Sequence, residues 1–115
     1  MSPQETEFLD GLFGPGVAEH YEADLRLIAL PDVALPDGCQ PARAMCIYVP
    51  QRYMGYDTRL FFQSPVVLKS GVTPAHTTAV LLGRTMYAAS INGVAATLPI
   101  HQGVIAHLRR YELAI

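Results

Sequence analysis

The sequence predicts an α+β domain in which an N-terminal helix, an antiparallel meander sheet and a C-terminal helix packed on the sheet follow one another. Three observations predict it: apolar residues recur at helical spacing at both ends of the chain, short runs of β-branched and aromatic residues fill the middle, and glycine or proline turns separate those runs. Elements adjacent in sequence usually pack side by side. The 115 residues suit one domain, spanning 1–115.

Composition excludes several classes of protein. Half of the residues are hydrophobic and 16% are charged, which is typical of a packed globular body. The net charge is −2 and the basic residues are scattered, so we expect no nucleic-acid partner. No apolar run reaches the length of about 18 residues that a membrane span needs. The N-terminus lacks a signal pattern, and two cysteines alone do not indicate a disulfide framework, so we expect a cytoplasmic protein.

The N-terminal helix is predicted over residues 2–13. Ser2 can cap it, Pro3 suits its first position, and Glu5 stands where a capping box places an acidic side chain. Gly14 ends it, since glycine tolerates the left-handed conformation that often follows a helix. The apolar stripe of this helix comprises Phe8, Leu9, Leu12 and Phe13.

Two strands follow, over 23–31 and 42–50, with the Pro36–Gly38 turn between them. The first is predicted to end at Pro31. The second alternates between two sets of apolar side chains, so both of its faces are predicted to be covered, as in a central strand.

The remaining strands are predicted over 58–65, 77–82, 84–91 and 94–98, with Asn92–Gly93 as a hairpin turn. The closing helix begins after Pro99. Its predicted buried stripe comprises Val104, Ile105, Leu108, Tyr111 and Ile115, and Gln102, Arg109 and Glu112 lie away from it.

The nucleophilic and metal-binding side chains form no known motif. Cys46 lies within a predicted strand and is expected to be a buried structural residue, whereas Cys39 in a turn is expected to be exposed. The four histidines include no pair with the i,i+4 spacing of a helical metal site. We therefore expect no metal and no cofactor. His76 lies in a predicted loop, where it is either an ordinary loop residue or part of a binding site.

The segment between the second and third of these strands contains Tyr53, Tyr56 and Asp57. Two alternatives explain the tyrosines. Their rings can pack over the edge of the sheet while their hydroxyls reach water or backbone, or they can form a recognition surface on an anchored loop.

The chain resembles the ubiquitin-conjugating (UBC) fold and, more narrowly, bacterial UBC-like proteins encoded beside ubiquitin-like proteins. The resemblance rests on "LPDG" at 35–38, "CIYVPQRYMGYDTRLFFQSPVVL" at 46–68, "LGR" at 82–84 and the closing "LPIHQGVIAHLRRYEL". It places Tyr53 on the family tyrosine and covers residues 12–113. The chain departs from the family pattern in lacking Gly before and Pro after Tyr53, and in having no tryptophan.

The resemblance implies a non-catalytic member, because no cysteine follows Cys46 and conjugating enzymes carry theirs after the third strand. It implies a binding or scaffold subunit of a ubiquitin-like modification or antiviral defence system. The partner would be a ubiquitin-like protein or an activating-enzyme-like subunit, bound through the Tyr53–Asp57 turn and the first helix.

Two other functions are alternatives. One is a small hydrolase with a site made from His76 or His101 and a carboxylate. The other is a homo-oligomeric structural or assembly protein of mobile-element origin, which the high apolar fraction favours.

Overall fold

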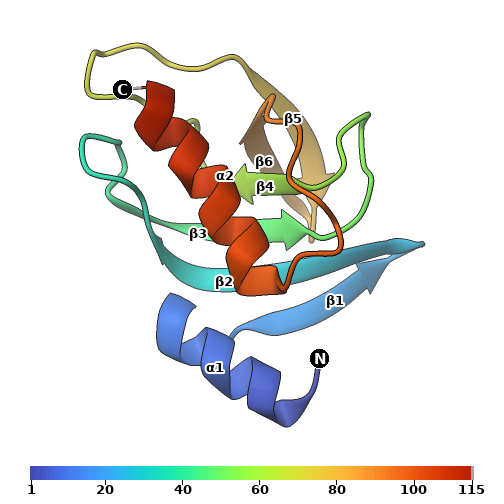
Figure 1. The fold of residues 1–115 in the computed structure, drawn as a ribbon. Helices are drawn as coiled ribbons and strands as arrows, with labels where there is room; N and C mark the ends of the chain where they lie inside the picture. The colour runs from blue at the N-terminus through green and yellow to red at the C-terminus, as the bar shows by residue number, and fades with distance from the viewer. Residues whose placement is uncertain (115) are drawn as a thin grey trace.

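The structure, a computed structural model, describes residues 1–114, in which a six-stranded antiparallel sheet is packed against two helices. In chain order the elements are α1 (Pro3–Phe13), β1 (Ala18–Glu22), β2 (Leu25–Ala34), β3 (Arg43–Val49), β4 (Arg59–Phe62), β5 (His76–Leu81), β6 (Arg84–Ala89) and α2 (Ile100–Ala114). Figure 1 shows α2 lying across the sheet and α1 beside β1 and β2. The predicted α+β class with a helix before and after the sheet is confirmed.

The order of the strands in the sheet is β1-β2-β3-β4-β6-β5. The first four strands form the predicted meander. The last hairpin is reversed, because β6 rather than β5 pairs with β4, through Phe62 opposite Tyr87. After β4 the chain crosses to the far edge of the sheet and forms β5. It then turns back and forms β6 between β5 and β4, so β5 is an edge strand.

Strand β1 was missed by the sequence analysis, since its residues are mostly polar and three of the five are exposed. Strand β2 was predicted to end at Pro31 but continues to Ala34. Its register with β3 shifts between Leu30 and Val33. Such a bulge takes a proline out of the hydrogen-bond ladder, so the strand can continue beyond it.

The predicted strand over 94–98 and the Asn92–Gly93 hairpin are wrong. The tight turn is instead Leu82–Gly83, between β5 and β6, where both residues have positive φ, 51° and 75°. This two-residue turn has the twist that hairpins need. Residues 94–98 leave the sheet and lead to α2. Val94 is buried, and its carbonyl accepts a hydrogen bond from the Thr58 side chain rather than from a neighbouring strand.

Both helices have termini close to the predicted ones. Ser2 caps α1, with its Oγ accepting from the Glu5 N–H at 3.1 Å. Only Leu9 and Phe13 of the predicted stripe are buried, because α1 lies at the margin of the sheet. In α2 the stripe is rotated: Ile105 is 38% exposed, and Gly103 and His107 face the core instead. Ile115 lies outside the described residues.

Two apolar cores form, one on each face of the sheet. The outer core lies between the sheet and the helices and contains Leu9, Phe13, Ile28, Leu30, Cys46, Tyr48, Leu60, Phe62, Val104 and Tyr111. The inner core lies within the curl of the sheet and contains Leu27, Ile47, Val49, Phe61, Leu81, Met86 and Ala88. Strand β3 contributes to both, which confirms the prediction that it is covered on its two faces.

Helix α2 approaches β3 closely at Gly103. A Cβ at this position would overlap the hydroxyl and ring of Tyr48, which is fully buried. Helix α2 can therefore lie this close to β3 only because residue 103 has no side chain.

We expect Gly103→Ala to lower the free energy of unfolding by about 1–3 kcal/mol, since the buried ring has to move. Urea titration followed by circular dichroism measures it. Tyr48→Phe in the Gly103→Ala background should restore part of the loss by removing the hydroxyl.

The matched control is Gly11→Ala in α1, where an added Cβ meets nothing within 4 Å. There the same substitution should stabilise by about 0.5–1 kcal/mol, because alanine favours helix. Equal effects at the two glycines would contradict the close approach of α2.

Candidate functional site

The segment that joins β3 to β4 spans residues 50–58 and contains a tight turn at Tyr53–Tyr56. The Tyr53 N–H donates to the Tyr56 carbonyl at 2.9 Å, and the Tyr56 N–H donates to the Tyr53 carbonyl at 3.1 Å. Met54 and Gly55 lie between them with φ of 53° and 85°. Positive φ at both central residues is characteristic of a type I′ turn.

An ion pair closes this turn from outside. Arg52 Nη1 lies 2.9 Å from Asp57 Oδ1, and Arg52 Nη2 donates to the Gly55 carbonyl at 3.3 Å. We call residues 52–57 the braced turn. The ion pair is largely exposed, so it contributes little stability.

The two tyrosine rings of the braced turn pack inward. The Tyr53 ring lies 6.1 Å from the Phe61 ring, at the margin of the inner core. The Tyr56 ring stacks on the guanidinium of Arg59, whose Cζ is 4.3 Å from the ring centroid. Both tyrosines are half-buried. Their rings therefore anchor the turn, and the exposed apolar side chain at its tip is that of Met54, at 45% exposure.

Arg59 is buried in the sheet without a carboxylate among its hydrogen-bond partners. Its Nη2 donates to Thr77 Oγ1, Ala88 O and Ala89 O. Its Nε and Nη1 have no partner among the described residues. Burial lowers the pKa of Arg59. The guanidinium thus joins β4 to the β5–β6 hairpin, where the β4–β6 ladder consists of a single pair.

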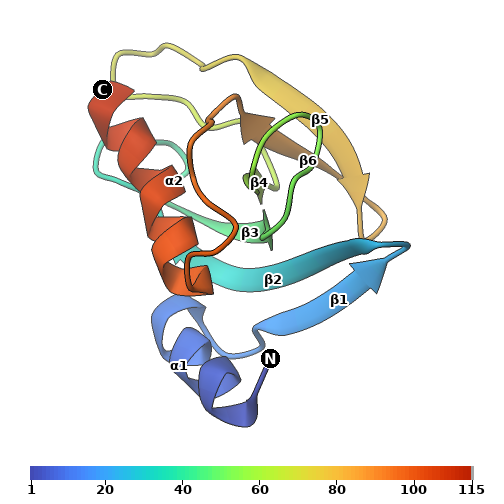
Figure 2. The same cartoon turned by 45° about the vertical axis from the view of Figure 1, so that its right-hand side comes forward.

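Three turns are joined at this end of the sheet by side chains that hydrogen-bond to backbone. Gln51 accepts from the Arg26 N–H at 2.9 Å and donates to the Asp24 carbonyl at 3.1 Å. Glu22 accepts from the Leu82 N–H at 2.8 Å. The β1–β2 turn therefore contacts both the base of the braced turn and the β5–β6 turn. Figure 2 shows the tips of the β1–β2 and β5–β6 hairpins beside each other.

Each of these three turns holds a non-glycine residue with positive φ: Ala23 at 53°, Met54 at 53° and Leu82 at 51°. A left-handed conformation costs such residues about 1–2 kcal/mol. Strain of this kind persists where the surrounding structure imposes it, and it is common at binding sites.

The structure groups Tyr53, Tyr56 and Asp57 but separates His76 from them. In the β5–β6 register His76 lies opposite Ala89, which packs against the outer core, whereas Thr77 lies opposite Ala88 in the inner core. The predicted loop position of His76 is wrong, because His76 is the first residue of β5 and is half-buried. Its Nε2 accepts from the Val66 N–H at 3.4 Å, and burial lowers its pKa.

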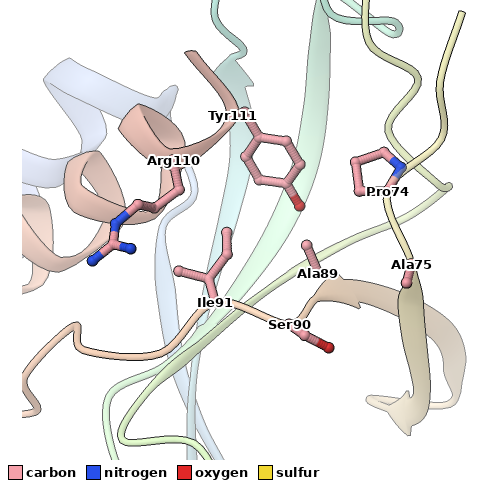
Figure 3. A pocket seen from close by; sticks show the side chains of 7 residues that line it. All are labelled: Pro74, Ala75, Ala89, Ser90, Ile91, Arg110 and Tyr111. Carbon is pink, nitrogen blue, oxygen red and sulfur yellow. The ribbon is translucent and has the colours of Figure 1, made fainter. Parts of the chain in front are cut away.

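A small pocket lies beside the start of β5, on the α2 side of the sheet. It has a volume of about 230 Å³ and is lined by Pro74, Ala75, Ala89, Ser90, Ile91, Arg110 and Tyr111. In Figure 3 the Tyr111 hydroxyl points towards Ala89 and the Arg110 guanidinium points away from the pocket. The lining is largely apolar and brings no carboxylate near His76.

The two cysteines are both buried, so the expected exposure of Cys39 is wrong. Burial raises the pKa of each thiol, which disfavours the reactive thiolate. Among residues 1–114, no three His, Cys, Asp or Glu side chains gather in a way that could hold a metal ion. His101 packs edge-to-face on Phe8, with 5.0 Å between ring centroids.

A buried polar cluster under α2 was missed by the sequence analysis. Thr58 Oγ1 lies 3.0 Å from the Val94 carbonyl and 2.8 Å from His107 Nε2. Because the carbonyl can only accept, the hydroxyl donates to Val94 and accepts from a protonated Nε2 of neutral His107. Burial, followed by the charges of Arg59 and Arg110, lowers the pKa of His107 to about 4.

Sequence signals existed for both missed features. His107 follows Val104 by three residues, on the buried side of a helix, and Arg59 interrupts an aromatic strand. Neither signal says what the side chain contacts, because the partner is distant in sequence: Thr58 for His107 and Ala88 for Arg59.

Comparison of the chain with protein families, curated proteins and solved structures gives no match. Within residues 1–114, neither helix has the length and apolar character to cross a bilayer. Any functional argument therefore depends on the geometry described above.

We expect His107 to make folding sensitive to acid. An unfolded histidine has a pKa of about 6.5, so between pH 6.5 and 4 the unfolded chain binds a proton that the folded protein excludes. The contribution is fully present above pH 6.5 and is lost as the pH falls through this window, amounting to about 3 kcal/mol. Urea titrations at several pH values measure it.

His107→Gln should flatten the pH dependence in this window, and His20→Gln is the control because His20 is exposed. A His107→Gln protein with the full slope of the wild type would show that other groups are responsible.

We expect Met54→Gly to stabilise the protein by about 0.5–1 kcal/mol, since glycine adopts positive φ without strain but gains entropy in the unfolded chain. Met54→Ala removes the same side chain and keeps the Cβ, so it should give no gain. Thermal and urea unfolding of both variants test this, and equal stability of the two would mean that the turn is unstrained.

Proposed function

We propose that the chain is a protein-binding subunit that contacts its partner through the braced turn. The observation that carries the proposal is Met54, which is 45% exposed and held in a left-handed conformation at the tip of a turn anchored from both sides. Glycine at this position would relieve the strain, and a strained non-glycine residue at an exposed tip is typical of binding sites. Methionine is a polarizable, adaptable side chain that suits protein contacts.

Rigid anchoring makes the turn suitable for recognition. The Tyr53 and Tyr56 rings and the Arg52–Asp57 ion pair hold the tip before any partner arrives. A pre-organised tip loses little conformational entropy on binding, so more of the contact energy contributes to affinity.

The partner class that we propose is a ubiquitin-like protein or an activating-enzyme-like subunit of a bacterial modification or defence system. Support comes from the element order, in which a helix precedes the meander β1–β4 and a tyrosine turn lies between β3 and β4. This order is similar to the UBC-like pattern that the sequence resembles. This is an argument from fold analogy. In this proposal the chain is a non-catalytic UBC-like scaffold.

The exposed face of α1 was the other part of the expected surface. Phe8 and Leu12 are 50% and 46% exposed. Figures 1 and 2 place α1 and the braced turn on opposite sides of β1 and β2. The proposal therefore uses the braced turn alone.

The first test is the gene neighbourhood, where we expect a ubiquitin-like protein or an activating-enzyme-like subunit to be encoded. The second test is calorimetric binding of those proteins to this chain. We expect one of them to bind, and Met54→Ala to weaken binding about ten-fold or more, as removal of an interface anchor does. Tyr53→Ala is a poorer probe because its ring packs in the core.

Val72→Ala is the control, since Val72 is 57% exposed and lies outside the braced turn. Full affinity in Met54→Ala would exclude the turn as the contact. Failure of the wild-type chain to bind either protein would refute the assignment to a ubiquitin-like system.

A further inference from the structure

The two edge strands of the sheet differ in how they are protected. Edge strand β1 contains Glu19, His20 and Glu22, and charged side chains on an edge discourage pairing with another chain. Edge strand β5 has the sequence HTTAVL, and residues 74–83 around it contain no Asp, Glu, Lys or Arg. Strand β5 thus lacks the usual protection of an exposed edge.

The exposed side of β5 is apolar and β-branched. Val80 is 70% exposed, and Thr78 on the same face is also exposed. Both residue types favour strands. Strand β5 is the last strand of the sheet, and Figures 1 and 2 show it at the margin of the molecule.

The hairpin turn determines which backbone groups of β5 point outward. A two-residue turn closes on a hydrogen-bonded pair, here Leu81 and Arg84. Alternation along an antiparallel ladder then directs Thr77, Ala79 and Leu81 towards β6. The N–H and C=O groups that point away from the sheet belong to His76, Thr78 and Val80.

We propose that β5 pairs with β5 of a second copy of this chain, antiparallel, about a two-fold axis at Thr78. In this register the outward-pointing N–H and C=O groups of His76, Thr78 and Val80 all pair with those of the same three residues in the other copy. No other register pairs all three residues in this way. Thr78 then faces its own copy, and Val80 faces His76 of the other copy. The two sheets join into one continuous sheet.

The chemistry of the edge favours a second copy over a different protein. In an isologous pair any charge on the strand meets the same charge nearby, and β5 has none. Two β1 edges would bring glutamates together instead. The inference is independent of the proposed function, because it uses β5 and not the braced turn.

Sedimentation velocity over a range of about 10–500 μM tests the pairing, because a short strand interface is expected to be weak. We expect a reversible dimer in the wild-type chain. Val80→Lys should raise the dimer dissociation constant at least about ten-fold, since a lysine on the edge opposes pairing. Tyr21→Lys on β1, where Tyr21 is 65% exposed, is the matched control and should dimerise normally.

A cross-link tests the register. Hydrogen-bonded antiparallel residues lie about 5.5 Å apart at Cα, which a disulfide can span. Thr78→Cys should therefore form a covalent dimer under mild oxidation, whereas Tyr21→Cys should not.

A wild-type monomer throughout the concentration range, or a dimer unaffected by Val80→Lys, overturns the proposal. Met54→Ala should leave the dimer intact and Val80→Lys should leave binding at the braced turn intact. Failure of one proposal is therefore distinguishable from failure of the other.

Discussion

The apolar character of both faces of β3 and β4 is the constraint on which the fold depends. A sheet of this kind has to cover two surfaces. The helices cover one, with Val104 and Tyr111 of α2 packed on the outer core. Within the described residues, neither α1 nor α2 covers the other face. The sheet covers it by curling, so that Leu81 and Met86 of the last hairpin meet Leu27 from β2. The contact of Glu22 with the Leu82 N–H ties the two ends of the curl.

Arg59 reinforces the junction between β4 and β6, which pair at a single residue pair. The guanidinium donates to the carbonyls of Ala88 and Ala89 and carries the Tyr56 ring on its face. The Arg59 side chain thereby links the junction of β4 and β6 to the braced turn. A buried cation that donates hydrogen bonds to carbonyls costs less free energy than a buried cation without partners.

The same end of the sheet concentrates backbone strain. Ala23, Met54 and Leu82 adopt left-handed conformations in three turns, of which the β1–β2 turn contacts the base of the braced turn and the β5–β6 turn. The strain at Leu82 has a structural reason, because the side chain follows the hairpin onto the inner core. Ala23 and Met54 are both exposed, but only Met54 presents a large apolar side chain. The braced turn therefore carries the functional proposal. The braced turn and the unprotected β5 edge are separate features. The braced turn is the proposed contact with a different protein, and the β5 edge is the proposed contact with a second copy of the chain.

The sequence by itself determined what depends on neighbouring residues: the capped α1 that starts at Ser2, the two-faced strand β3 and the α+β class, because capping and periodicity are local. It also located the tyrosine turn but not its geometry. Only the tertiary structure decided that β6 and not β5 pairs with β4, that Cys39 and His107 are buried, and that Arg59 bridges two strands. Strand pairing and burial depend on which distant segments meet, and the physical reason is that local dihedral preferences are compatible with several such pairings.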